Sequence, residues 1–174
     1  MPLPVNNLRA KETNLLIRPA TAQDHASLWQ ILEPTIRAGE TFALPRDMGS
    51  AEAIAYWTAP DREAFLAEDS GRALGTFYLR ANQLGGGSHV ANCGYMTDPT
   101  ATGQGVARAM GVRSLDLARE RGFKAMQFNF VVSTNERAVR LWQSLGFAIA
   151  ARLPAAFLHP RLGYVDALVM FRAL

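Results

Sequence analysis

The chain has 174 residues, of which 49% are hydrophobic and 19% charged, so it can form one domain with a substantial core but not two of ordinary size. Its 18 basic and 15 acidic residues give a formal charge of +3, and the basic residues do not gather into the stripe that nucleic-acid binding requires. No apolar run reaches the roughly 18 residues of a membrane span, and the N-terminus lacks the apolar stretch of a signal peptide. We therefore expect a cytoplasmic protein that binds neither nucleic acid nor a membrane.

The content of cysteine and histidine argues against a metal site. The chain has one cysteine, Cys93, and three histidines, which are too few ligands for a structural zinc site. A single cysteine cannot form an internal disulfide, and we expect Cys93 to be a small core residue on the opposite face of its strand from Asn92. We predict no bound metal.

The first half of the chain predicts three strands and two helices. Residues 1–12 contain prolines and no periodicity, which is typical of a flexible N-terminal tail, and we expect one domain over residues 13–174. Pro34 is expected to end the first helix, since proline cannot donate a helical hydrogen bond. The predicted elements are, in chain order, a strand at 15–18, helices at 21–33 and 50–58, and strands at 64–68 and 73–80.

The second half continues the alternation of strands and helices. Gly94, in the middle of the fourth strand, indicates a bulge or a close approach of another group to the backbone. The predicted elements are a strand at 90–97, a helix from Gly105 to 121, a strand at 125–132, a helix at 135–145 and strands at 148–153 and 164–172, the last two joined by a proline-rich loop at 154–163. The order indicates a single α+β domain with a mixed sheet.

A glycine-rich segment connects the fourth strand to the helix that follows. Gly103 and Gly105 allow the backbone N–H groups of residues 103–107 to point toward one position at the helix N-terminus, where a phosphate or pyrophosphate could bind. A glycine-rich loop without a ligand is the alternative. A P-loop is excluded because Val106 follows the second glycine, and a dinucleotide fingerprint is excluded because Arg108 occupies its last position and the strand is the fourth.

Residues 129–147 decide between these interpretations. Here the sequence resembles the GNAT superfamily of acyl-CoA-dependent N-acetyltransferases: residues 102–107 are similar to its Q/R-x-x-G-x-G/A pyrophosphate motif, and residues 135–147 to its N-x-x-A-x-x-x-Y-x-x-x-G-F helix. The order of elements agrees from about residue 14 to the end. The resemblance implies a three-layer fold with about four helices and a seven-stranded, mostly antiparallel sheet, splayed between strands four and five, with acetyl-CoA in the gap.

The resemblance also implies which residues bind acetyl-CoA. Backbone N–H groups of residues 103–107 would hold the pyrophosphate, while Asn135 and the backbone near Met96 would hold the pantetheine. Thr102 replaces the usual Arg or Gln, so its hydroxyl or Arg108 would supply that contact. Trp142 stands where many members have a tyrosine that protonates the thiolate, and an indole N–H is no practical acid. The implied set is Met96, Thr97, Thr102, Gly103, Gln104, Gly105, Val106, Ala107, Arg108, Asn135 and Trp142.

The chemistry requires a neutral amine. An amine with a pKa of roughly 10.4 is almost wholly protonated at pH 7, so a general base would ordinarily assist. The only carboxylates near the expected site are Asp98, Glu68 and Asp69, and Asp98 is explained more simply as the end of a strand.

Two asparagines offer another route. Asn92 and Asn129 interrupt apolar strands beside the implied gap, as acceptor-binding groups or as hydrogen-bonded core amides. With Asn92, the segment 129–135 is similar to fungal acetyltransferases that act on proline analogues, in which asparagines line the acceptor site. This similarity implies that Asn92 and Asn129 orient the acceptor and the thioester oxygen.

Two loops, 34–49 and 154–163, are expected to lie over the acetyl group. Arg37, Thr41, Phe42 and Arg46 are the acceptor-binding candidates in the first loop, because an arginine can bind a carboxylate; the alternative is that they are solvated loop residues. Ser133 and Glu136 have the spacing of a helix capping box.

The function that the resemblance implies is direct transfer of an acetyl group from acetyl-CoA to the amine of a small molecule. An amino acid or a proline-analogue-like imino acid is the first candidate. Acetylation of a protein or peptide and a non-catalytic acyl-CoA sensor are the alternatives. The resemblance also implies a possible homodimer.

Overall fold

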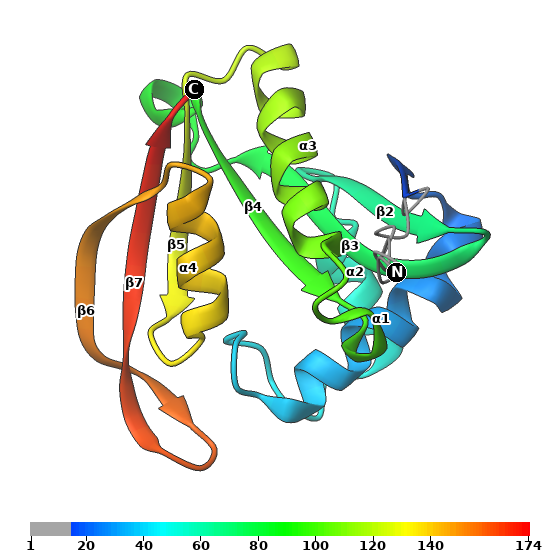
Figure 1. Ribbon diagram of the computed structural model, residues 1–174, viewed down its shortest axis with the longest axis horizontal. Helices are drawn as coiled ribbons and strands as arrows, with labels where there is room; N and C mark the ends of the chain where they lie inside the picture. Colours follow the sequence, from blue (N-terminus) through cyan, green and yellow to red (C-terminus); the bar gives the residue numbers. More distant parts are fainter. Residues whose placement is uncertain (1–14) are drawn as a thin grey trace, which may run out of the picture.

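The computed structural model describes residues 15–174, and the predicted tail at 1–12 lies outside them. One seven-stranded sheet runs through the molecule in the order β1-β2-β3-β4-β5-β7-β6 (Figure 1). Its neighbours are antiparallel except β4 and β5, which are parallel. The strands are β1 (Leu16–Pro19), β2 (Glu63–Asp69), β3 (Arg72–Ala81), β4 (Val90–Thr97), β5 (Ala125–Val132), β6 (Ala148–His159) and β7 (Gly163–Ala173). The expected mixed, mostly antiparallel sheet is confirmed.

Helices cover both faces of the sheet, which gives three layers. On one face, α1 (His25–Ala38) and α2 (Ser50–Trp57) bury an apolar cluster with side chains of β2, β3 and β4. On the other face, α3 (Val106–Glu120) and α4 (Glu136–Ser144) bury a larger cluster. Short 3₁₀ turns lie at Ala22–Asp24, Gly85–Gly87 and Pro99–Ala101. None of the helices within residues 15–174 is long and apolar enough to cross a membrane.

The sheet is splayed between β4 and β5, as expected. Backbone pairing of the two strands is confined to Val90 with Ala125 and Ala91 with Met126. Beyond these pairs the strands diverge, and α4 lies beside β5 at the wide end (Figure 1). The unpaired half of β4 therefore has backbone groups available for a ligand.

Gly94 marks a close approach rather than a bulge. The register between β3 and β4 is continuous through the pair of Tyr78 and Gly94. A side chain at Gly94 would place its Cβ 2.6 Å from the ring of Tyr78, so the phenol lies directly over the middle of β4. Only glycine leaves room for it.

Pro34 does not end α1, contrary to the prediction. The helix continues to Ala38 and stops at Gly39, which adopts a left-handed φ of 64°. Ile36, in the turn after the proline, is 2% exposed. Because this burial continues the apolar face of the helix, it offsets the hydrogen bond that Pro34 cannot donate.

The predicted loop at 154–163 is also wrong, because most of it is strand. β6 runs through Pro154 to His159 and pairs with β7, so the connection is a tight hairpin turn. The pairing is irregular between Leu153 and Phe157, where Ala155 has a φ of 52°. β6 is an edge strand, and a proline is tolerated in such a strand where the ladder is interrupted.

Candidate active site

Two cavities meet where β4 and β5 diverge. The larger, about 650 Å³, lies between the end of β4, the N-terminus of α3 and α4. The smaller, about 240 Å³, lies between β3, β4, β5 and the segment after α1. The residues that line both cavities are Thr41, Tyr95, Asn135, Ala138 and Trp142. A ligand in one cavity can therefore touch a ligand in the other.

The larger cavity contains nearly all of the residues expected to bind the cofactor. Gly103 and Gly105 have φ values of 83° and 81°, which let the chain turn sharply into α3 and leave the N–H groups of its first turn unpaired. Gln104 is the exception, since its side chain donates a 3.0 Å hydrogen bond to the Thr100 carbonyl instead. The expected residues on the wall are Met96, Thr97, Thr102, Gly103, Gly105, Val106, Ala107, Arg108, Asn135 and Trp142.

The charge of the larger cavity suits an anion. Arg108, Arg137 and Arg140 line it, and none of its described lining residues is acidic. Arg108 donates a 3.0 Å hydrogen bond to the Ser144 hydroxyl and so links α3 to α4. Arg137 and Arg140 were not predicted, although they flank the Ala138 of the helix motif.

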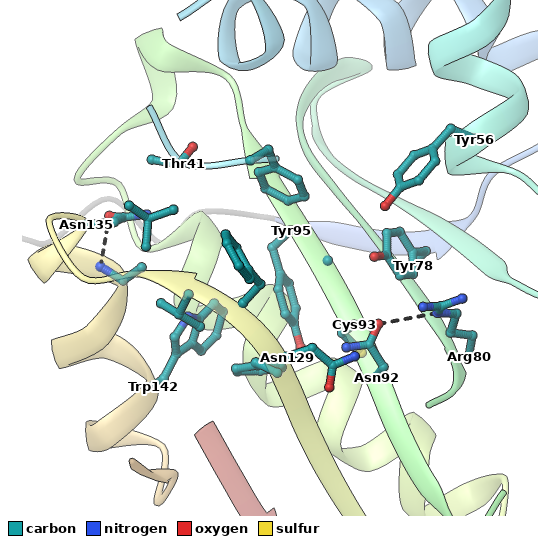
Figure 2. Close-up of a pocket in the computed structure, with 17 residues that line it drawn as sticks. Thr41, Tyr56, Tyr78, Arg80, Asn92, Cys93, Tyr95, Asn129, Asn135 and Trp142 are labelled. Atoms are coloured by element: carbon teal, nitrogen blue, oxygen red, sulfur yellow. Dashed lines mark hydrogen bonds between the residues drawn. The ribbon is translucent and has the colours of Figure 1, made fainter. Parts of the chain in front are cut away.

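Asn135 is the N-cap of α4. Its Oδ1 accepts a 3.3 Å hydrogen bond from the Ala138 N–H, so the predicted capping box at Ser133 and Glu136 is wrong and the cap lies two residues later. This cap fixes the Asn135 side chain beside both cavities (Figure 2).

The Trp142 side chain lies between β4 and β5, where the two strands diverge. It is 6% exposed, and its ring centroid lies 4.7 Å from that of Tyr95 and 4.9 Å from that of Phe128. The indole thus packs β4 against β5 at the point where the cavities meet.

Asn92 lines the smaller cavity and also links β4 to β5 through its side chain. Its Nδ2 donates a 3.0 Å hydrogen bond to the carbonyl of Gln127 on β5, and its Oδ1 accepts a 3.4 Å hydrogen bond from Arg80 Nε. The dashed line in Figure 2 marks the contact with Arg80. Asn92 is therefore a hydrogen-bonded amide whose side chain also lines the smaller cavity, and its binding of an acceptor stays a prediction.

Asn129 belongs to a second amide chain. Its Oδ1 accepts a 2.8 Å hydrogen bond from Gln127 Nε2, and its Nδ2 donates a 2.6 Å hydrogen bond to Asn82 Oδ1. Asn82 follows β3 and was not predicted, because the glycine-rich hairpin that carries it shows no sequence pattern pointing to the site. These bonds hold Asn129 on the opposite side of β4 from Tyr78 and Arg80 (Figure 2).

No carboxylate lines either cavity among the described residues. Asp98 accepts hydrogen bonds from the Thr100 hydroxyl and N–H at 2.6 and 2.7 Å, and these contacts lower the pKa of its carboxyl group. Glu68 pairs with Arg18 at 3.1 Å, and Asp69 accepts a hydrogen bond from Ser70. None of the three is placed to remove a proton in the cavities.

The acceptor candidates of the first loop separate into two groups. Thr41 and Phe42 line the smaller cavity. Arg37 does not: its Nη1 donates a 2.9 Å hydrogen bond to the Met48 carbonyl, and Arg46 Nε donates a 2.9 Å hydrogen bond to the Arg37 carbonyl. Both arginines therefore stabilise the loop, and neither lines either of the two cavities.

Tyr56, Tyr78 and Arg80 line the smaller cavity without having been predicted. The available signal was the single charge of Arg80 at the end of an apolar strand. Cys93 is buried, and burial raises the pKa of its thiol to about 12, so it is no nucleophile near neutral pH. Within residues 15–174, no group of three His, Cys, Asp or Glu side chains is placed to hold a metal.

Comparison with known structures finds acetyltransferases with the same fold. A GCN5-related N-acetyltransferase from Kribbella flavida is 38% identical, with a TM-score of 0.87 over 92% of this chain and 98% of that chain. The fold also matches that of yncA from Salmonella typhimurium, solved with its cofactor acetyl-CoA, at 22% identity and a TM-score of 0.80 over 92% of this chain and 94% of that one.

Sequence comparison agrees. The N-acetyltransferase aca1 of Schizosaccharomyces pombe is 35% identical over 112 residues, which are 64% of this chain and about half, 54%, of that protein. A model of the acetyltransferase (GNAT) family matches residues 26–147, which carry both sequence motifs and most of the walls of the two cavities. The chain therefore belongs to the acetyltransferase (GNAT) family.

Proposed function

We propose that the protein transfers the acetyl group of acetyl-CoA directly to the amine of a small molecule, with an amino or imino acid as the favoured acceptor. The meeting of the two cavities at the splay carries this proposal. The larger cavity suits an extended anionic cofactor, and the smaller one, at about 240 Å³, suits a small acceptor. Their shared lining brings donor and acceptor together.

The larger cavity fits acetyl-CoA in shape and charge. A Cβ at Gly105 would meet nothing within 4 Å, so the first turn of α3 is open to a pyrophosphate, and its N–H groups and positive dipole end favour one. Arg108, Arg137 and Arg140 add positive charge. The pantetheine would lie along the unpaired half of β4 at Met96 and Thr97, with Asn135 beside it.

Asn92 and Asn129 would act by orientation. A carboxamide cannot accept a proton at neutral pH, so the two side chains would position the acceptor and the thioester oxygen while water removes the amine proton. N–H groups of β4 would polarise the carbonyl. Since Cys93 is buried and protonated, the acetyl group would pass directly from sulfur to nitrogen.

Two alternatives make different demands on the site. Acetylation of a protein or peptide would need room for the chain attached to the reacting residue, and the volume of the smaller cavity, about 240 Å³, favours a small acceptor instead. A sensor would bind acetyl-CoA without turnover. The sensor alternative is supported by the indole of Trp142 and by the absence of a carboxylate among the residues within 15–174 that line the cavities.

The test is release of free CoA thiol from acetyl-CoA in the presence of a panel of acceptors. The panel contains amino acids, imino acids such as azetidine-2-carboxylate, polyamines and short peptides. Release with an amino or imino acid and recovery of its N-acetyl product would support the proposal. Turnover with peptides alone, or binding of acetyl-CoA without any turnover, would replace it with one of the alternatives.

We also propose that the protein acts in the cytoplasm as a homodimer. β6 is an edge strand of the sheet, and the β6–β7 hairpin exposes Leu158, Leu162 and Tyr164 at 62%, 62% and 74%. A second copy that packs on this hairpin would bury these side chains. Light scattering during size-exclusion chromatography would measure a mass of twice 19.0 kDa for the dimer, and a monomer mass would contradict it.

A further inference from the structure

The end of the smaller cavity away from α4 carries positive charge. Arg80 is its one charged lining residue among those described, and the Arg80 side chain is 27% exposed. Figure 2 shows Arg80 beside Tyr78, with Tyr56 above them, on the opposite side of β4 from Trp142 and Asn135. Arg80 belongs to the third strand and was not among the acceptor candidates of the sequence.

A second guanidinium lies behind this wall. The Arg62 side chain is 9% exposed, and its guanidinium carbon lies 4.2 Å from the ring centroid of Tyr56 and 4.6 Å from that of Tyr78. Its Nη1 is buried without a hydrogen-bond partner. The two tyrosine rings thus separate a buried cation from the cavity.

The positive charge is only partly neutralised. Asp61 is the one carboxylate paired with these guanidinium groups, at 3.1 Å from Arg80 Nη1 and 3.3 Å from Arg62 Nε, and its side chain is 57% exposed. Two cations and one carboxylate leave this end of the cavity with a net charge of +1. A net positive charge in a partly enclosed site attracts an anion more strongly than it would in open solvent.

We propose that Arg80 binds a carboxylate on the acceptor and is the residue that selects amino or imino acids over simple amines. This inference rests on the proposed function and assigns the specificity of the same site. Arg80 Nη1 already donates to Asp61 and Nε to Asn92, so Nη2 and the second Nη1 hydrogen are the donors that a carboxylate on the acceptor would use. Arg62 would reinforce the site through its charge.

The register of β3 and β4 places Arg80 close to Gly94 along the strands. Arg80 pairs with Asn92, and Tyr78 pairs with Gly94. Arg80 therefore lies two residues, or roughly 7 Å, along the strands from Gly94, where β4 has no side chain. The amine and the carboxylate of an α-amino or α-imino acid are attached to the same carbon, so an acceptor with its amine near Gly94 would need the long Arg80 side chain to extend back along β3 toward its carboxylate. A longer diamine would place its second cation against Arg80.

The test compares an acid with its uncharged carboxamide. Azetidine-2-carboxylate and azetidine-2-carboxamide, or the best amino acid of the panel and its carboxamide, are assayed with the native protein and with Arg80→Met. We expect the ratio of kcat/KM for acid over carboxamide to fall about 10- to 100-fold in Arg80→Met, since a charged hydrogen-bonded pair is lost. Comparing ratios cancels the difference in amine pKa between the two acceptors.

Matched variants separate recognition from structure. Arg72→Met removes an arginine from the same strand outside both cavities, and the ratio should stay at its native value. If Arg80→Met does not fold, Arg80→Lys serves instead, and the ratio should still fall severalfold because the bidentate fork is lost. Equal losses for acid and carboxamide in a folded Arg80 variant would overturn the inference and leave the proposed function intact. Absence of acetylation of every small amine would overturn both.

Discussion

Asn92 Nδ2 donates a hydrogen bond to the Gln127 carbonyl one residue beyond the last backbone pair of β4 and β5, Ala91 with Met126. The side chain thus makes the cross-strand bond at the position where the backbone ladder ends. This hydrogen bond therefore lies at the point where the two strands diverge, beside the smaller cavity.

Asn92→Ala should therefore damage both stability and catalysis. Loss of this buried hydrogen bond should lower the free energy of unfolding by about 1–3 kcal/mol, and kcat should fall at least tenfold if the amide orients the reacting groups. Urea denaturation and steady-state kinetics measure the two effects. Asn129→Ala is the comparison: its side chain lies between two other side-chain amides, so its effect on stability should be smaller. Native kcat in both variants would rule out catalytic roles for these asparagines.

Gly105→Ala should weaken acetyl-CoA binding. Gly105 has a φ of 81° and caps α3, and a side chain there would cost about 1–2 kcal/mol in this conformation or move the first-turn N–H groups. We expect the Kd for acetyl-CoA, measured by calorimetry, to rise about tenfold. Gly122→Ala is the matched control, because Gly122 has a φ of 83° just beyond the other end of α3. It should lose similar stability and keep the native Kd; a raised Kd in both would indicate a general effect on α3.

The pH dependence of stability should depend on Asp24. Arg18 Nη2 and Nη1 donate to its carboxylate at 2.8 and 2.9 Å, and Thr21 N–H donates at 2.7 Å. The hydrogen bonds from Arg18 are the main cause of its lowered pKa. Because the native carboxylate binds a proton less readily than the unfolded one, this contribution is present above the unfolded pKa of roughly 4 and is lost as the pH falls through lower values.

Asp24→Asn should consequently lower the free energy of unfolding at pH 7 by about 1.5–3 kcal/mol and flatten its dependence on pH below 5. Denaturation at a series of pH values measures both. Asp116→Asn removes an exposed carboxylate paired with Arg119 and should change stability by no more than about 0.5 kcal/mol. Parallel pH profiles for Asp24→Asn and the native protein would contradict the role of Asp24.

The sequence predicted features that depend on neighbouring residues better than features that depend on tertiary contacts. The strand at 90–97 and the glycines that follow it are contiguous, so the local sequence predicted a strand, a turn and a helix N-terminus that could bind a phosphate. The fold and the cofactor-binding residues were implied by the resemblance of residues 102–107 and 135–147 to the GNAT superfamily. Pro34 misled the prediction because burial of Ile36, a tertiary effect, outweighs a local preference. The strand through Pro154 depends likewise on pairing with β7.

The residues of the smaller cavity were predicted less completely for the same reason. Tyr56, Arg80 and Asn129 come from three separate elements, α2, β3 and β5, and only the packing of α2 on the sheet and the register of the hairpin bring them together. Arg37 has the charge that a carboxylate site needs, but it hydrogen-bonds the Met48 carbonyl and does not line the smaller cavity, whereas Arg80 does. Residue type alone could not separate it from Arg80.

Trp142 should not supply a proton to the departing thiolate. Its indole packs on Tyr95 and Phe128, and an indole N–H is far too weak an acid to act at neutral pH. Trp142→Phe keeps an aromatic ring in this position and removes the N–H. We expect its kcat to stay well within the roughly 100-fold loss that removal of a general acid causes, with thiol release at saturating acetyl-CoA as the measurement.

Trp142→Tyr provides the opposite change at the same position. A phenol with a pKa of about 10 can protonate a thiolate, so kcat should be higher in Trp142→Tyr than in Trp142→Phe if protonation of the leaving group limits turnover. Both variants shorten the side chain, so the comparison between them removes the common loss of packing. A 100-fold loss in Trp142→Phe that Trp142→Tyr restores, with native acetyl-CoA affinity in both, would mean instead that the indole N–H hydrogen-bonds the reacting sulfur or carbonyl in the native protein.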